Sequence, residues 1–343
     1  MSLIAVARVI RYRILQGAVL LLCFNLSAEE KIFTLKQKEA DLLAGESWAI
    51  CYSGFRSGQH PDRGDGAKNP SEKEMLEDLE ILTKAGFKLI RLYDSRENSE
   101  AILKLIKSEK LPMKVLLGAW LDGEVNNPKC PWKPKPFTPE ELAAKKIGNS
   151  EEVDRLIKLA NQYPDSVAAV AIGNEALVEW NDHMVPVESV ISYVKKVKRS
   201  IKQPVTVADN YDWWARFGKS LAEHLDFVSV HIYPVWEGKP VEEGRSFGGA
   251  NMEAVRKALP AAKLVITEAG WATVASEFGE RATQGAQARY SREMKSWAEK
   301  NHITTLFFEA FDEDWQGAPN NPKGAEKHWG IFDINRKPKK VMQ

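Results

Sequence analysis

The sequence is poor in the residues and patterns that mark several large classes of protein. It has 343 residues but only three cysteines, which is too few for a disulfide-stabilised scaffold. None of the three belongs to a CxxC pair, so a structural zinc site of that kind is not expected. The six histidines show no HExxH or similar ligand spacing, and the sequence therefore implies no catalytic metal and no cofactor.

The sequence also has no excess of charge of either sign. The sequence has 48 Lys and Arg residues against 47 Asp and Glu residues, which gives a formal net charge of +1. Binding to nucleic acid normally needs a basic surface, so nucleic acid is not the expected partner. No GxxxxGK[ST] loop occurs, and no GxGxxG follows the first expected strand, so no nucleotide is expected either.

Only the N-terminus carries a long apolar run. Three arginines precede the segment 14–24, and Asn25-Leu-Ser-Ala28 supplies small residues where a signal peptidase could cleave. This pattern predicts a signal peptide at residues 1–28, followed by an N-terminal lead-in at 29–46. The run is short for a membrane span, but an uncleaved signal anchor stays open as the one route to a membrane. The expected location is therefore secreted, periplasmic or in the cell envelope.

Two of the cysteines lie beyond that segment. Cys51 falls in a strand-like stretch and Cys130 in a proline-rich loop. The favoured interpretation is a buried thiol at Cys51 and a partly exposed thiol at Cys130. A disulfide between them is the alternative.

Beyond residue 44, short apolar runs alternate with longer amphipathic segments. The short runs are apolar on both faces, which is typical of buried parallel strands. We expect strands at Trp48–Ser53, Lys88–Tyr93, Lys114–Ala119, Ala168–Ile172, Val205–Ala208, Phe227–Tyr233, Leu264–Thr267 and Thr305–Phe311. We expect helices at Ser71–Ala85, Ser99–Ser108, Ser150–Gln162, Val187–Ile201, Trp213–His224, Met252–Leu259 and Thr283–Asn301.

This alternation predicts an α/β fold, a single (β/α)8 TIM barrel over residues 47–343. Parallel strands need long crossovers, which the helices supply, and eight such units can close into a barrel. Residues 54–70 and 128–139 are expected to be long loops. A doubly wound open sheet is the alternative fold.

Two glutamates directly follow apolar strands. Glu175 ends the segment Val167–Glu175, and Glu268 ends the segment Lys263–Glu268. Active sites of such barrels lie at the C-terminal ends of the strands, where an unpaired buried carboxylate would be costly. Each glutamate alone could simply form a salt bridge with Arg91 or a lysine. Two of them at one end of a barrel favour a glycosidase, because paired carboxylates cleave glycosidic bonds.

Several motifs resemble glycoside hydrolase family 17, the β-1,3-glucanase family of (β/α)8 barrels, over about residues 47–335. Ile172-Gly-Asn-Glu175 is similar to the acid/base motif of that family, and Thr267-Glu-Ala-Gly-Trp271 to its nucleophile motif. Further similar segments, some typical of the bacterial branch, are Trp48–Ser53, Gly58–Pro61, Ile90–Asp94, Val205–Asp209, His231–Gly238, Glu309–Glu313 and Lys327–Phe332.

The resemblance implies a retaining mechanism. Glu175 would be the acid/base and Glu268 the nucleophile, with their carboxyl groups about 5–5.5 Å apart. Asn174 would bind the sugar 2-hydroxyl, and Tyr233 could hold Glu268 through its hydroxyl group. The proximity of ionised Glu268 would raise the pKa of Glu175.

Weaker candidates occupy the other strand ends. The remaining expected substrate-binding residues are Tyr52, Tyr93, Asp94, Trp236, Trp271, Trp315 and Glu313. The expected supporting residues are Arg91, His231, Asp209 and Glu309. The sequence has eleven tryptophans, and the three named here follow strands six to eight, where flat rings can stack on sugars.

Other functions remain open at this point. The expected reaction is endo-acting hydrolysis of β-1,3-glucan, with a β-glucan polysaccharide or oligosaccharide as partner. A glucanosyltransferase would use the same two glutamates, and a β-1,4-glycosidase or an inactive glucan-binding barrel are further alternatives. Gly244-Arg-Ser-Phe-Gly248 fits the GxSxG pattern of serine hydrolases, but a polar loop rather than a strand is expected before it.

Overall fold

The computed structural model describes residues 35–62, 66–132 and 135–343. The expected signal peptide at 1–28 and the first part of the lead-in lie outside these residues. Among the helices that the structure describes, none is long and apolar enough to cross a membrane.

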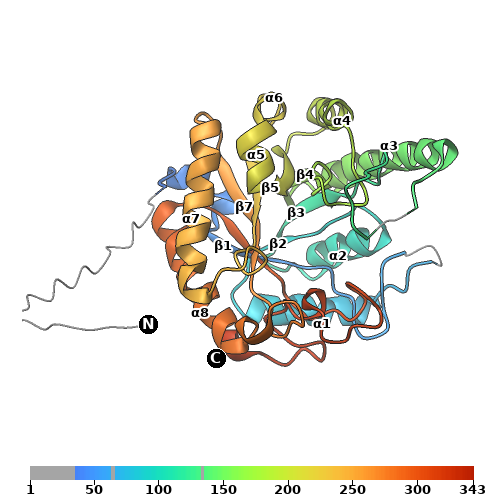
Figure 1. The fold of residues 1–343 in the computed structure, drawn as a ribbon. Helices are drawn as coiled ribbons and strands as arrows, with labels where there is room; N and C mark the ends of the chain where they lie inside the picture. The colour runs from blue at the N-terminus through green and yellow to red at the C-terminus, as the bar shows by residue number, and fades with distance from the viewer. Residues whose placement is uncertain (1–34, 63–65, 133–134) are drawn as a thin grey trace, which may run out of the picture. The chain divides into compact units, whose positions relative to one another are not determined.

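Eight parallel strands form a closed barrel in chain order, which confirms the predicted (β/α)8 fold (Figure 1). Each strand pairs with the next, and β1 pairs with β8 to close the ring. The strands are β1 (Trp48–Cys51), β2 (Leu89–Arg91), β3 (Lys114–Ala119), β4 (Val167–Asn174), β5 (Val205–Asn210), β6 (Val228–Ile232), β7 (Leu264–Gly270) and β8 (Thr305–Phe308).

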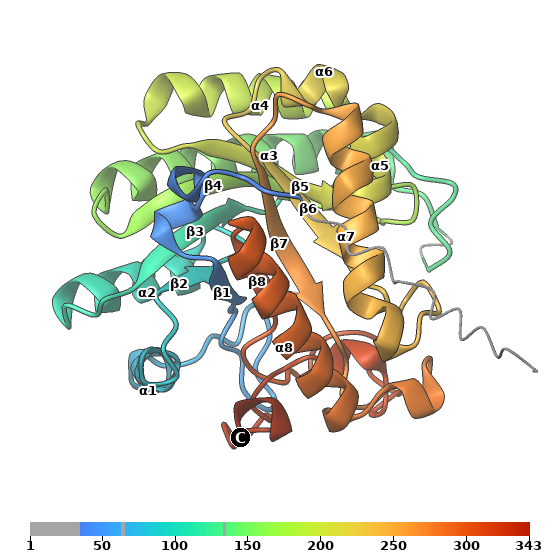
Figure 2. The ribbon, with the colours of Figure 1, turned by 90° about the vertical axis from the view of Figure 1, so that its left-hand side faces the viewer.

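Helices run between the strands on the outside of the barrel (Figure 2). They are α1 (Glu72–Lys84), α2 (Glu97–Ser108), α3 (Pro139–Gln162), α4 (Val187–Ser200), α5 (Tyr211–Phe217), α6 (Lys219–Ala222), α7 (Val241–Ala258) and α8 (Gln284–Asn301). Short 3-10 turns precede β1 at Glu39–Asp41 and Leu43–Gly45, and others lie at Gly279–Arg281, Ala325–Lys327 and Lys340–Met342.

Two helices begin about eleven residues earlier than the sequence predicts. Helix α3 starts at Pro139 because Thr138 and Glu141 form a reciprocal capping box at its first turn. Helix α7 starts at Val241 and includes Gly244, where an added Cβ would lie 2.8 Å from the Tyr290 ring. Gly244, which looks like a loop residue in the sequence, is therefore a site of close helix packing.

The GxSxG pattern falls inside α7. The Ser246 hydroxyl donates a hydrogen bond to the carbonyl of Glu243 one turn earlier. A serine nucleophile would need a strand before it and a helix directly after it, so the serine hydrolase interpretation is wrong.

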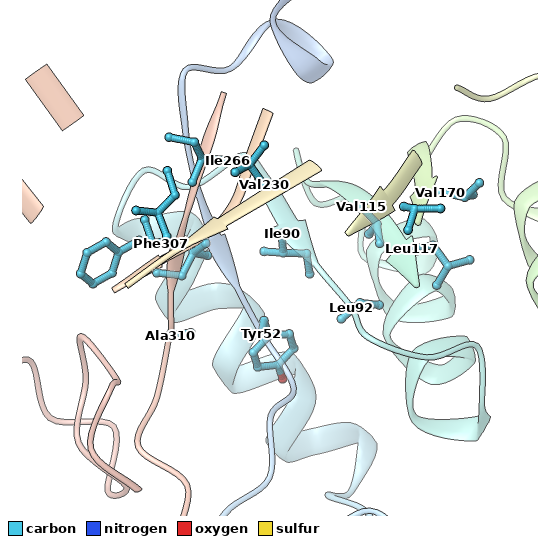
Figure 3. Close-up of a cluster of buried hydrophobic side chains, with 14 of the residues drawn as sticks. Tyr52, Ile90, Leu92, Val115, Leu117, Val170, Val230, Ile266, Phe307 and Ala310 are labelled. Carbon is cyan, nitrogen blue, oxygen red and sulfur yellow. The ribbon is translucent and has the colours of Figure 1, made fainter. Parts of the chain in front are cut away.

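The core has two layers that follow the alternation of side chains along the strands. Ala49, Cys51, Leu89, Leu116 and Leu306 belong to the smaller cluster, which fills the barrel interior. Their sequence neighbours belong to the larger cluster, between the strands and the helices, and part of it is drawn in Figure 3. Thr206 and Ser229 are buried polar residues within β5 and β6, whereas the buried charged side chains of the strands, Arg91, Asp209 and Glu268, lie near the C-terminal ends.

The two described cysteines are unpaired. Both Cys51 and Cys130 are buried, and the Cys51 thiol donates to the carbonyl of Thr267 at 3.3 Å. The expected buried thiol at Cys51 is confirmed. The expected exposure of Cys130 is wrong, because its loop packs down beside the chain after β4 through the amide of Asn127.

Candidate active site

The carboxylate of Glu268 lies near the end of β7 and accepts three hydrogen bonds. Its Oε1 accepts from Arg91 Nη1 at 2.7 Å and from the Tyr93 hydroxyl at 3.1 Å. Its Oε2 accepts from the Tyr233 hydroxyl at 2.6 Å, as the sequence predicts. These donors come from the ends of β2 and β6, so two other strands hold the carboxylate that β7 carries in a fixed orientation.

A break in the register of β7 directs Glu268 into the barrel. The pairing of β7 with both neighbours shifts between Ile266 and Ala269. At this irregularity the carbonyl of Thr267 points inward and accepts from both Cys51 and Arg91. Bulges of this kind re-aim side chains and are frequent beside active sites. Strand alternation alone would not have placed the Glu268 side chain.

Glu175 follows β4 in a left-handed backbone conformation. Its φ is 47°, a region in which non-glycine residues are strained, and Gly173 just before it has φ of 80°. The side-chain amide of Asn181 donates a hydrogen bond to the backbone carbonyl of Glu175. The backbone amide of Glu175 donates to the carbonyl of Ala208 on β5. These contacts hold the strained backbone. Burial raises the pKa of the Glu175 carboxyl above its usual range.

His231 on β6 lies between the two glutamates. Its Nδ1 is 3.1 Å from Oε1 of Glu175 and 3.5 Å from Oε2 of Glu268. The sum of these distances is the upper limit for the separation of the two oxygens. That limit falls at the short end of the range of about 6.5–9.5 Å for inverting glycosidases and is compatible with the shorter spacing of retaining ones.

Arg91 connects the residues of this centre. Its guanidinium is buried and contacts Glu268, Nε2 of His231 at 3.2 Å and Oδ1 of Asn174 at 2.6 Å. Because a guanidinium only donates, the Asn174 oxygen is fixed toward Arg91 and the amide NH2 of Asn174 is left for another acceptor.

Asp209 supports the backbone after Glu175. It is fully buried at the end of β5, where its two oxygens accept from the amides of Leu177 and Asn210. Burial, with a further contribution from Glu175, raises the pKa of Asp209 well above its usual range. Its contacts make it a support for the loop that follows Glu175.

Two further carboxyl groups lie beyond β8. Glu309 and Glu313 are buried and share the side-chain amide of Gln316, which donates to both. Glu313 also accepts from the Ser53 hydroxyl and from the indole of Trp315. Burial raises the pKa of Glu313 to about 7 and that of Glu309 well above its usual range. Glu309 therefore packs with Gln316.

Three predicted substrate-binding residues have other roles. Tyr52 is buried between β1 and α1, and its hydroxyl contacts Asp78 at 3.3 Å. Trp271 is completely buried and donates its indole N–H to the Arg281 carbonyl. Neither ring can meet a sugar, so both expectations are wrong. Asp94 uses its Oδ1 to accept from Arg96 and Ser99 at the start of α2.

The other two tryptophans differ in their surroundings. Trp236, after β6, is 46% exposed and packs edge-on against Phe278. Trp315 is half-buried against Phe55, with its N–H directed to Glu313. Trp236 therefore keeps a ring available to a ligand, whereas Trp315 helps to orient Glu313.

Two residues near these groups were not predicted from the sequence. His183 lies in the loop after Glu175 and contacts the carbonyl of Asn174, and Gln316 bridges the carboxyl groups of Glu309 and Glu313. The sequence prediction relied on polar residues that directly follow a strand, and each of these two residues lies several positions further into a loop. Over the residues that the structure describes, no three His, Cys, Asp or Glu side chains are grouped to hold a metal ion.

A parallel (β/α)8 barrel with two close glutamates at the ends of its fourth and seventh strands has the architecture of a barrel glycosidase. The sequence of residues 49–330 matches the family model described as "BtgE/BtgC glycoside hydrolase domain". The chain belongs to this family.

Known proteins agree with this assignment. A glucan 1,3-beta-glucosidase of Arthroderma benhamiae is 25% identical over 300 residues, which cover 80% of this chain and 87% of that protein. The crystal structure of an endo-laminarinase from Formosa is 25% identical, with a TM-score of 0.75 over 89% of this chain and 88% of that one. A β-1,3-glucanosyltransferase mutant of Rhizomucor miehei, in complex with laminaritriose, shares the fold at 21% identity, with a TM-score of 0.67 over 86% and 96% of the two chains. The resemblance to glycoside hydrolase family 17 is confirmed.

Proposed function

We propose that the protein is a retaining, endo-acting hydrolase of β-1,3-glucan. The observation that carries this proposal is the position of His231 Nδ1, which lies 3.1 Å from Glu175 and 3.5 Å from Glu268 and so brings the two carboxyl groups close together. The names of the Arthroderma and Formosa relatives supply the choice of β-1,3-glucan.

In the first step, Glu175 protonates the glycosidic oxygen while Glu268 attacks the anomeric carbon. Oε1 of Glu268 already accepts from Arg91 and Tyr93, whereas Oε2 accepts from Tyr233. Oε2 therefore has the freer lone pair and faces His231 and Glu175, so it is the attacking oxygen. Asn174, whose amide oxygen is bound by Arg91, presents its NH2 group to the sugar 2-hydroxyl.

In the second step, Glu175 acts as a base and activates the acceptor that cleaves the glycosyl ester on Glu268. Water as acceptor gives hydrolysis, and a sugar hydroxyl gives transfer. The same two glutamates serve both outcomes, so the acceptor decides between a hydrolase and a glucanosyltransferase.

The reaction can be tested with laminarin and laminari-oligosaccharides of defined length. We expect a series of shorter oligosaccharides, and we expect proton NMR to show that the first product has the β-anomeric configuration. Products longer than the substrate would identify a transferase. Glucose as the sole early product would indicate exo action, and cleavage of β-1,4-glucan in preference to laminarin would overturn the substrate assignment.

The two glutamates can be tested separately. Glu268→Gln is expected to abolish turnover, and Glu175→Ala to lower kcat by about 10²–10⁴-fold because general acid catalysis is lost. Azide should rescue Glu175→Ala on an aryl β-glucoside with a good leaving group and give a β-glycosyl azide, but it should not rescue Glu268→Gln. A folded Glu268→Gln variant with full activity would exclude this mechanism.

The N-terminal segment supports export as a further part of the proposal. Fractionation of cells that express the full chain should place the activity outside the cytoplasm.

A further inference from the structure

His183 lies in the loop that follows Glu175, and both of its ring nitrogens have partners. Nε2 is 2.9 Å from the carbonyl oxygen of Asn174, the residue directly before Glu175. Nδ1 is 2.9 Å from Oδ1 of Asp182. The ring also packs on Trp120, at the end of β3, with 4.8 Å between ring centroids and 32° between planes.

Both partners of the ring are hydrogen-bond acceptors. A carbonyl oxygen and a carboxylate oxygen only accept hydrogen bonds, so both contacts are hydrogen bonds only when each ring nitrogen of His183 carries a proton. A neutral imidazole has one N–H and would turn a lone pair toward one of the two oxygens. Only the imidazolium donates to both, and the aromatic face of Trp120 further favours a cation.

The position of the ring is fixed from several sides. The amides of Glu124 and Val125, in the loop after β3, both donate to the carbonyl of Met184. Gly123 in the same loop lies so close that a Cβ there would be 3.2 Å from the His183 Cα. These contacts clamp the backbone of the loop after Glu175 to the loop after β3, and the ring itself is held by Asn174, Asp182 and Trp120.

Extending the proposed function, we propose that His183 is a positioning residue that holds a positive charge beside Glu175 and stabilises its carboxylate form. Glu175 must be protonated in the first step and ionised in the second, so its two forms have to be balanced. Burial favours the neutral acid, and a cation at the adjacent carbonyl favours the base that activates the acceptor.

The direction of the electrostatic effects on Glu175 agrees with this role. Burial raises the pKa of Glu175, while His183 is the first of two groups that act to lower it, with Arg91 as the second. Among the described residues, the elements that contact the His183 loop carry Asp182 in that loop, Glu175 after β4, and Asp122 and Glu124 in the loop after β3. The last two have lysine partners, at 3.8 Å from Lys145 for Asp122 and 3.6 Å from Lys146 for Glu124.

A matched pair of variants separates charge from hydrogen bonding. In His183→Gln the amide N–H can replace Nε2–H and keep the bond to Asn174 without a charge. His183→Lys keeps a cation at the same place. The pH dependence of kcat/KM on a laminari-oligosaccharide reports the acid form of Glu175 in the free enzyme.

We expect the alkaline limb of the profile to move upward by roughly one pH unit in His183→Gln and to return toward the wild-type position in His183→Lys. An unmoved limb in a folded, active His183→Gln variant would overturn the proposal, as would a fall in kcat without displacement in both variants. Nitrogen-15 NMR spectra of the full chain report the protonation state of His183 without any measurement of activity. Imidazolium shifts for His183 in the active pH range would support the assignment, and a neutral tautomer would refute it.

Failure of the proposed function and failure of the proposal for His183 would give different results. Wild-type enzyme without turnover on any β-glucan would defeat the proposed function. An active wild-type enzyme whose profile ignores His183 would defeat only this inference.

Discussion

The imidazole of His231 donates a hydrogen bond to Glu175, and the direction of that bond is set by a third side chain. Arg91 can only donate, so its contact with Nε2 of His231 leaves the ring proton on Nδ1, 3.1 Å from Oε1 of Glu175. Burial lowers the pKa of His231 to about 3, which keeps the ring neutral near neutral pH. With Oε1 occupied as an acceptor, the acidic proton of Glu175 belongs on Oε2.

The bond between His231 and Glu175 can be tested by replacing the histidine. His231→Leu removes the donor, and we expect kcat/KM on laminari-oligosaccharides to fall about 10- to 100-fold because a hydrogen bond to the acid is lost. His231→Asn can place an amide N–H near the position of Nδ1 and should retain more activity. Full activity in a folded leucine variant would show that the orientation of Glu175 does not depend on this bond.

Tyr233 and Tyr52 should differ in their effect on catalysis, because their hydroxyl groups contact different carboxylates. Tyr233→Phe removes a 2.6 Å hydrogen bond to Glu268 and should lower kcat about 10- to 100-fold with little change in stability. Tyr52→Phe serves as the matched control, because its hydroxyl contacts Asp78 outside the barrel interior. It should leave kcat unchanged and cost about 1 kcal/mol of unfolding free energy. Equal kcat values for the two variants would contradict this division.

Two tryptophans that look alike in the sequence should also behave differently. Trp271→Ala empties a completely buried site and should lower the free energy of unfolding by about 3–5 kcal/mol. Trp236→Ala truncates a ring that is 46% exposed, so stability should change little while KM rises a few-fold through lost stacking. Denaturant unfolding and steady-state kinetics on the same samples measure both effects. An unchanged KM for Trp236→Ala would remove this ring from the substrate site.

Glu313 should make stability depend on pH. Its pKa rises from 4.5 to about 7 in the folded protein, so the folded state holds a proton that the unfolded state has already released between these values. The stabilisation is complete below pH 4.5 and is lost as the pH rises through about 7, amounting to roughly 3 kcal/mol at 1.36 kcal/mol per unit.

Urea unfolding of the wild type and of Glu313→Gln at a series of pH values would measure this contribution. The wild type should lose stability relative to the variant as the pH rises from about 4.5 to about 7. A constant difference between the two proteins across that interval would show that Glu313 ionises normally.

The barrel and the end at which its buried charged side chains lie could be predicted from the sequence because both depend on local pattern. Buried parallel strands are apolar on both faces, and the polar residue that follows each strand lies at the same end of a closed barrel whatever the details. This rule places Glu175, Glu268, Asn174, Tyr233 and Arg91 at one end, and the structure brings them together there. The same rule overreached at Tyr52 and Trp271, because the residue after a strand can point outward as well as inward.

The direction in which each of these side chains points was decided only by the tertiary structure. The register break in β7 directs Glu268 inward, and the left-handed conformation of Glu175 depends on contacts with Asn181 and β5. His183 became visible only when its two acceptors and Trp120 were brought together from three segments of the chain. The sequence by itself determined which groups meet at the end of the barrel, since strand order and polarity are local properties. Their orientation and charge were decided by the fold, since hydrogen-bond partners and burial come from residues distant in sequence.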